Sequence, residues 1–214
     1  MQTKVDQIIS EAERFLQKKS FDMAHGLEHH LQVWDNVQKI IGGIEEKVDE
    51  TALQIAARWH DVVTETKKVT KKRAKKTTAK FVAQRMADLG FPQSTINKTK
   101  TAILEHSVMN NQSILESKVL ADADLLEWFN IERFLKTLQI YNSGKGAKIK
   151  KIALKRFAKK WTHKIPDLIH FDITRKFYHQ KLAEFKKDMR VKKAVLEKYG
   201  EKIEKYGEKI EKFI

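Results

Sequence analysis

Prolines and glycines are scarce in this chain, and their scarcity limits the folds open to it. Its 214 residues contain two prolines, Pro92 and Pro166, and eight glycines. Strand-rich folds need many turns and usually carry more of both residue types. No segment alternates apolar and polar residues over a useful length, as a strand would. We therefore expect an all-α protein, long enough to bury a core without disulfides or structural metals.

Apolar residues recur at helical spacing along most of the chain. Asp49 can cap the helix that contains ALQIAARW, and Ser94-Thr95 can cap the helix that follows them. The lysine-rich run 67–80 is either a loop or the solvated start of the next helix. The predicted helices span residues 3–18, 20–41, 50–63, 79–90, 96–107, 115–134, 147–161 and 171–196. The inner side of the last of these is predicted to carry Phe177, Leu182, Phe185 and Met189.

The end of the chain repeats a seven-residue sequence. Residues 197–203 and 204–210 both read EKYGEKI, and EKFI follows them. The apolar residues alternate by four and three, which is a heptad stripe. Two heptads are short and each glycine costs about 1 kcal/mol in a helix, so packing against the body, packing against a partner subunit and an unstructured extension all stay open. We expect a helical domain over residues 1–190 and a heptad-like helical extension over 191–214.

Basic residues outnumber acidic ones by 43 to 28, which gives the chain a net charge of +15. Such an excess attracts polyanions such as nucleic acid, nucleotides or anionic lipid. A lysine-rich proteome or adaptation to heat explains the charge at least as well. Any nucleic-acid binding that rests on charge alone is therefore expected to be unspecific.

The chain has no cysteine. Disulfides, zinc ribbons and thiol nucleophiles are therefore excluded, and any metal must bind His, Asp or Glu. The first residues are polar and lack the apolar core of a signal peptide. No stretch approaches the roughly 18 apolar residues of a membrane span. We expect a cytoplasmic protein without a membrane span.

Polar groups that can bind a metal interrupt three apolar helices. They are His25 and His29 on one helix, His60-Asp61 on the next, and Asp122 and Asp124 on a third. Burying a charged group in such surroundings is costly unless it is paired or bound to a metal. Imidazole and carboxylate are ligands for a divalent metal of intermediate hardness. Taken singly, each group can be a surface pair, a core histidine or a helix cap; the order His, His-Asp, Asp on apolar helices favours a metal site.

This order resembles that of the HD superfamily of metal-dependent phosphohydrolases. HGLEHHLQVW is similar to the family's H-x-x-x-H-x-x-R-V helix, AARWHDVV to its A-A-L-L-H-D-I helix, and LADADLLEW to its D-A-D-x-L helix. Gln32 stands where the family often has arginine. The resemblance covers residues 20–130 and implies a single HD-type helical domain. It also implies a metal held by His29, His60, Asp61 and Asp124, with Asp122 as the alternative to Asp124.

The resemblance further implies a hydrolase that acts on a nucleotide or another small phosphate ester or anhydride. The reaction would be that of a phosphomonoesterase, a phosphodiesterase or a pyrophosphohydrolase. One divalent metal ion is expected, from among Mn, Fe, Ni and Mg, because sites of this composition accept several metals. The alternative is a non-catalytic HD-fold module that binds nucleotide or RNA through its basic face. Both interpretations are compatible with a monomer or a homodimer.

Other residues would serve the reaction around the metal. Asp61 is both a ligand and a candidate catalytic residue. His106, in a segment similar to the family's H-S segment, would bind phosphate or donate a proton, or else would face solvent. Glu65, four residues after Asp61, would act as a general base or pair with a lysine in solvent. The candidates for binding the substrate are His25, Arg58, Lys67 and Lys68.

Overall fold

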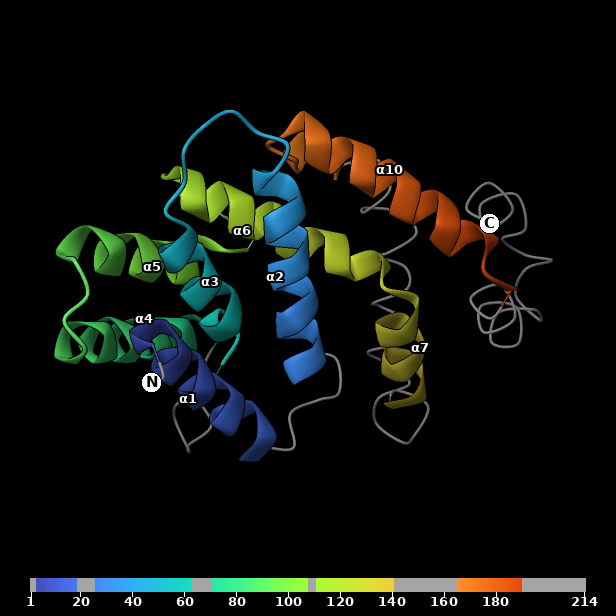
Figure 1. Cartoon of the computed structure of the whole chain (residues 1–214). Coiled ribbons are helices and arrows are strands. Elements are labelled where there is room, and N and C mark those ends of the chain that lie inside the picture. Colours follow the sequence, from blue (N-terminus) through green and yellow to red (C-terminus); the bar gives the residue numbers. More distant parts are fainter. Residues whose placement is uncertain (1–2, 19–25, 63–70, 108–110, 141–164, 190–214) are drawn as a thin grey trace. The chain divides into compact units, whose positions relative to one another are not determined.

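The computed structural model describes residues 3–18, 26–62, 71–107, 111–140 and 165–189 (Figure 1). Within these ranges the chain forms helices, loops and turns but no strand, so the predicted all-α class is confirmed. The chain divides into two compact units, Met1–Glu127 and Trp128–Ile214. The predicted helix 147–161 and the extension 191–214 lie outside the described residues, and the predicted boundary at residue 190 stays a prediction. No helix in the described ranges is both long enough and apolar enough to cross a bilayer.

The first unit is built around one central helix, α3 (Glu50–Trp59) (Figure 1). Most of its residues are buried, because its sequence, ETALQIAARW, is apolar around most of its circumference. A helix buried in this way places the residues that follow its last turn inside the protein. Its neighbours are α1 (Lys4–Lys18), α2 (Leu27–Ile41), α5 (Gln93–Glu105) and α6 (Leu115–Leu126), and α4 (Lys71–Asp88) packs against α5 and α1.

Asp49 joins two of these helices. As predicted, it caps α3, with Oδ1 accepting a hydrogen bond of 2.9 Å from a first-turn N–H. Its Oδ2 accepts a second bond of 2.8 Å from the Thr95 hydroxyl in α5. The prediction that Ser94-Thr95 caps α5 is therefore wrong. That helix begins at Gln93, directly after Pro92, because the fixed φ of proline suits a helix start and its missing N–H costs nothing there.

Trp59 fixes the last turn of α3 against α1 and α4. Its ring is fully buried, with centroids 5.7 Å from Phe15 and 5.5 Å from Phe81. Its indole N–H donates a hydrogen bond of 3.0 Å to the carbonyl of Ile8. Aromatic pairs at these distances add to the stabilisation from buried area. The position of the next two residues, His60-Asp61, is therefore set by the core of the first unit.

The predicted helix 115–134 is divided into two helices. Helix α6 ends at Leu126. A short 3-10 turn, η1 (Glu127–Phe129), follows it, and a new helix, α7 (Ile131–Ile140), begins at Ile131. Asn130 explains the restart, because its Oδ1 accepts a hydrogen bond of 3.0 Å from the Arg133 N–H, which caps the new helix.

In the second unit, helix α10 (Asp172–Lys187) follows the 3-10 turn η3 (Pro166–Leu168). Phe185 is buried, as predicted, and its ring centroid lies 6.0 Å from that of Phe129. The inward position predicted for Met189 is wrong, since 71% of this residue is exposed. The helix ends at Lys187, before it reaches Met189. Tyr178 is fully buried on α10 instead, with its ring centroid 5.1 Å from Phe129.

Candidate metal centre

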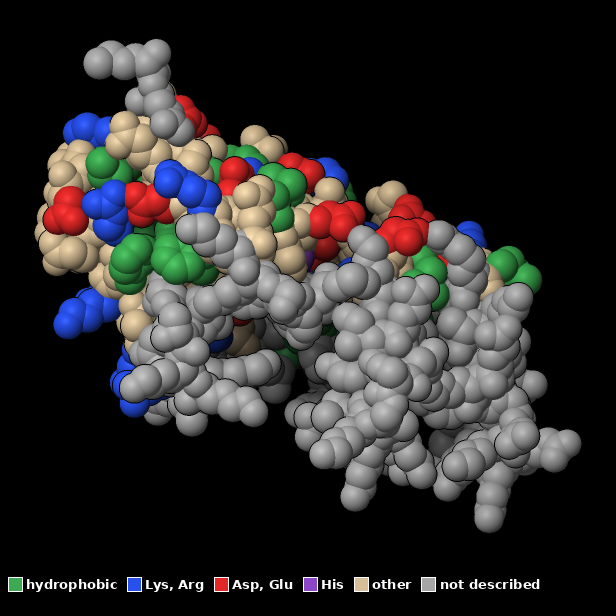
Figure 2. Space-filling model, turned by 90° about the horizontal axis from the view of Figure 1, so that it is seen from below, with side chains coloured by type: hydrophobic (Ala, Val, Ile, Leu, Met, Phe, Trp, Pro, Cys, Tyr) green, Lys and Arg blue, Asp and Glu red, His purple; other side chains and the backbone are tan. Residues whose placement is uncertain are grey.

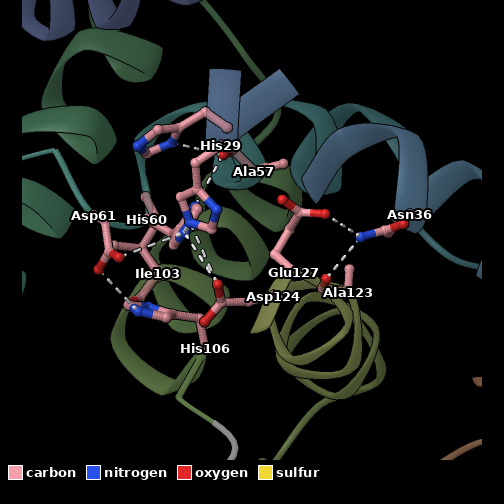
Figure 3. Close-up of polar contacts among 11 residues, drawn as sticks. His29, Asn36, Ala57, His60, Asp61, Ile103, His106, Ala123, Asp124 and Glu127 are labelled. Atoms are coloured by element: carbon pink, nitrogen blue, oxygen red, sulfur yellow. Dashed lines mark hydrogen bonds and ion pairs between the residues drawn. The ribbon is translucent and has the colours of Figure 1, made fainter. Parts of the chain in front are cut away.

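Four of the predicted ligands meet where α2, α3 and α6 adjoin (Figure 3). His29 lies in the first turn of α2, His60-Asp61 directly follow α3, and Asp124 lies in α6. The Nε2 atoms of His29 and His60 are 3.2 Å apart. Asp124 Oδ1 lies 3.4 Å from His29 Nε2 and 3.9 Å from His60 Nε2. Asp61 Oδ2 lies 3.8 Å from His60 Nε2. Helix packing thus brings together two imidazoles and two carboxylates from distant positions in the sequence.

A backbone carbonyl fixes the orientation and tautomer of His60. Its Nδ1 lies 2.9 Å from the carbonyl oxygen of Ala57 (Figure 3). A carbonyl only accepts hydrogen bonds, so Nδ1 carries the hydrogen. In the neutral ring, Nε2 then has a lone pair on the side of His29 and the carboxylates. A histidine that donates one N–H to a carbonyl and directs the other nitrogen at acidic groups is arranged as a metal ligand.

The spacing of these donor atoms fits one metal ion. Donors at about 2.0–2.2 Å from an ion lie roughly 2.9–4.3 Å from one another in tetrahedral and octahedral coordination. The four donor separations given above run from 3.2 to 3.9 Å. Donor atoms of His29, His60 and Asp61 also all lie within 4.8 Å of one another. The residues present therefore suit a divalent metal, both by distance and by the mixture of nitrogen and oxygen donors.

The two imidazoles are buried and the two carboxylates are partly exposed. The side chains of His29 and His60 are 2% and 0% exposed, against 15% for Asp124 and 27% for Asp61. Solvent therefore reaches the cluster from its carboxylate side.

His106 joins the cluster at Asp61. It directly follows α5, and its Nδ1 lies 2.8 Å from the carbonyl oxygen of Ile103, so Nδ1 carries a hydrogen. Its Nε2 lies 3.3 Å from Asp61 Oδ1, and its side chain is 4% exposed. An Nε2 that faces a carboxylate interacts favourably with it when that nitrogen also carries a proton. His106 is therefore placed to hold a proton beside the candidate ligands, and it does not face solvent.

The two aspartates of α6 lie in different surroundings. Asp124 contacts the imidazoles as described above, whereas Asp122 is fully buried. Residues two apart on a helix differ by about 200° in direction, so the two carboxylates point to different sides of α6. The geometry therefore favours Asp124 over Asp122 as the fourth ligand.

Arg58 does not join the cluster, although it is only two residues from His60. Its charged neighbours are Glu13 and Asp35. Burial lowers the pKa of the Arg58 guanidinium, and the attraction of these two acids offsets only part of that decrease. Arg58 and His60 are two residues apart, so their side chains differ by about 200° in direction around the axis of α3, and Arg58 points away from the cluster. The other predicted residues, His25, Glu65, Lys67 and Lys68, lie outside the described residues.

His30 and a buried polar pair were not predicted from the sequence. His30 is fully buried beside His29, and its ring centroid lies 4.6 Å from that of His60. Burial, followed by the nearby His60, lowers the pKa of His30 to about 3. Asn36 donates to Glu127 Oε1 at 3.4 Å and to a carbonyl of α6 at 3.1 Å, which joins α2 to α6. The adjacent pair of histidines at the start of an apolar helix was the available signal for His30.

The fold and the cluster define an all-helical domain with a two-histidine, two-aspartate site of the kind that holds a divalent metal. Residues 26–128 match the HD domain family. The predicted resemblance to the HD superfamily is confirmed. The match ends just after α6, so it includes all four candidate ligands and His106.

A solved structure supports the same fold. The chain is similar to the crystal structure of a predicted HD superfamily hydrolase from an uncultured Thermotogales bacterium, with a TM-score of 0.51 and 20% sequence identity. The similarity covers 81% of this chain and 84% of the other. No curated protein sequence matches the chain.

Proposed function

We propose that this chain is a metal-dependent phosphohydrolase that cleaves a nucleotide or another small phosphate ester or anhydride. The observation that carries the proposal is the convergence of His29 Nε2 and His60 Nε2, 3.2 Å apart, with the carboxylates of Asp61 and Asp124 in an HD domain. Phosphoryl transfer depends mainly on positioning and on stabilising charge. A partly exposed cluster of metal-binding groups suits that requirement.

The four ligands would hold one divalent ion. When bound, such an ion lowers the pKa of a water molecule and offsets negative charge on phosphoryl oxygens. The Ala57 carbonyl keeps the Nε2 lone pair of His60 on the side of the carboxylates. Because Asp61 and Asp124 are the more exposed ligands, they border the side from which a phosphate group would enter.

His106 would act as the proton donor of the reaction. Its Nε2 lies 3.3 Å from Asp61 Oδ1, so a proton on this nitrogen is held beside the ligands and can pass to the leaving oxygen. The roles of Glu65 as general base and of His25, Lys67 and Lys68 in binding phosphate rest on the family resemblance. A nucleotide as substrate, a cytoplasmic location and a monomeric or homodimeric state also stay predictions.

The test begins with metal analysis of the purified protein, followed by a phosphate-release screen over nucleotides and other small phosphate compounds. We expect activity that requires a divalent metal and is lost in His60→Ala and Asp61→Ala. Thr95→Val is the matched control, because it removes a hydrogen bond at the opposite end of α3, from the Thr95 hydroxyl to Asp49, without touching a ligand. Full activity in either ligand variant would contradict the proposal.

The alternative is a non-catalytic module that binds nucleotide or RNA through basic residues. Its support is the net charge of +15. On the face shown in Figure 2, however, acidic and basic side chains of the described residues are interspersed. This alternative predicts polyanion binding that weakens steeply with salt and survives Asp124→Asn.

A further inference from the structure

His30 makes a contact between two helices beside the candidate ligands. It follows His29 on α2 and is fully buried. Its Nδ1 lies 3.1 Å from the carbonyl oxygen of Ala57 on α3, and since a carbonyl only accepts, this nitrogen is the donor. The hydrogen bond therefore joins the first turn of α2, which carries one candidate ligand, to the last turn of α3, which precedes the next two.

The acceptor of this bond is shared with His60. The Ala57 oxygen accepts from His60 Nδ1 at 2.9 Å and from His30 Nδ1 at 3.1 Å. The rings of His30 and His60 are also in contact, with centroids 4.6 Å apart and planes at 44°. His30 thus holds the carbonyl that orients His60 and packs against the His60 ring itself.

His30 is not itself placed as a ligand. The group of close donor atoms found among the described residues consists of His29, His60 and Asp61. An effect of His30 on a bound metal would therefore be transmitted through His60.

A purely space-filling role explains the imidazole poorly. The Nε2 of His30 is buried without a hydrogen-bond partner among the described residues. A buried polar atom without a partner lowers stability, and an aliphatic side chain would fill the same space without one. What an aliphatic residue cannot supply is the N–H that reaches Ala57 from α2.

We propose that His30 is a positioning residue that sets the spacing of the ligands His29 and His60 by tying α2 to the carbonyl that orients His60. This inference rests on the proposed metal site. Because outer partners of ligating histidines typically change metal affinity by about 10- to 100-fold, the effect is large enough to measure directly.

The experiment compares two variants of the full chain. His30→Asn keeps an N–H donor near the position of Nδ1, and His30→Leu keeps the bulk but removes the donor. Co²⁺ is titrated into each metal-free protein, with calorimetry for affinity and visible absorption for the coordination environment. Thr95→Val is the control, since it removes a 2.8 Å hydrogen bond between α5 and the N-cap of α3 without contacting a ligand.

We expect His30→Leu to bind Co²⁺ roughly 10- to 100-fold more weakly than the wild type, with an altered absorption band. His30→Asn should recover most of the affinity, and Thr95→Val should match the wild type. Affinity within threefold of the wild type in His30→Leu would overturn the inference and leave the metal site intact. Equal losses in His30→Asn and His30→Leu would also overturn it, since the N–H would then be irrelevant. Absence of Co²⁺ binding by the wild type would overturn the proposed site together with the inference.

Discussion

A divalent metal should raise the melting temperature of the metal-free protein, and His60→Asn should abolish that increase. His29 and His60 are 31 positions apart, and Asp124 lies on yet another helix, so the unfolded chain cannot present the same site. A ligand that binds only the folded state stabilises that state by mass action. Asparagine retains an N–H in place of Nδ1, to donate to Ala57, but has no counterpart of Nε2.

The size of the increase follows from this linkage. At a free metal concentration 100 times the dissociation constant, the folded state gains about 2.7 kcal/mol. For a chain of about this size, each kcal/mol shifts the melting temperature by roughly 2–4 °C. We therefore expect an increase of roughly 5–11 °C in the wild type. His60→Asn should start from a lower melting temperature, because the smaller side chain leaves a cavity that costs about 1–3 kcal/mol.

Differential scanning fluorimetry of the EDTA-treated proteins, with and without Mn²⁺ or Co²⁺, provides the measurement. The quantity compared is the metal-dependent shift within each variant, so the lower starting point of His60→Asn does not affect the result. An equal shift in the wild type and in His60→Asn would show that the metal binds elsewhere. No shift in the wild type with either metal would refute the assignment of the cluster as a metal site.

Three further outcomes are expected. Asp124→Asn should weaken metal binding roughly 10-fold or more, measured by calorimetry, while Asp122→Asn should leave the affinity close to that of the wild type. Lowering the pH from 7 to 5 should destabilise the metal-free protein by about 2 kcal/mol through His30. Below pH 6.5 the unfolded chain binds a proton at this residue, whereas the folded chain, with a pKa of about 3, does not. In urea unfolding at the two pH values, the free energy of unfolding of His30→Leu should fall by about 2 kcal/mol less than that of the wild type, because this variant lacks the imidazole. Asp49→Ala should lower the free energy of unfolding by about 2 kcal/mol, because α3 loses its cap and Thr95 loses its acceptor; a loss below 0.5 kcal/mol in the same assay would contradict that account.

The sequence predicted well the features that depend on a single helix and the residues at its two ends. His60-Asp61 stood out because they follow a helix that is apolar around most of its circumference, and the structure buries that helix among four others. The cap at Asp49 was predictable for a similar reason, since it depends only on residues within one turn. Interactions of this range are determined by the spacing of residue types along the chain.

Contacts between helices were not predictable in the same way. Helical periodicity gives the inner face of each helix, but not which residues meet across an interface. Thr95 was assigned to cap its own helix, and it donates to Asp49 on another element. Arg58 was a candidate cation for binding the substrate, and its direction around α3 takes it to Glu13 and Asp35. The bond from His30 to Ala57 likewise depends on the register between α2 and α3.

The order of the proposed ligands along the chain has a consequence during synthesis. His29, His60 and Asp61 leave the ribosome before Asp124, so a nascent α2–α3 pair offers two nitrogen donors and one carboxylate. Nitrogen-rich sites of this kind bind the late first-row metals most tightly, and added carboxylate oxygens suit harder ions better. The second carboxylate arrives only when α6 docks against α2. At the proposed site, metal preference would therefore be a property of the completed domain and would differ from that of the nascent segment that precedes it.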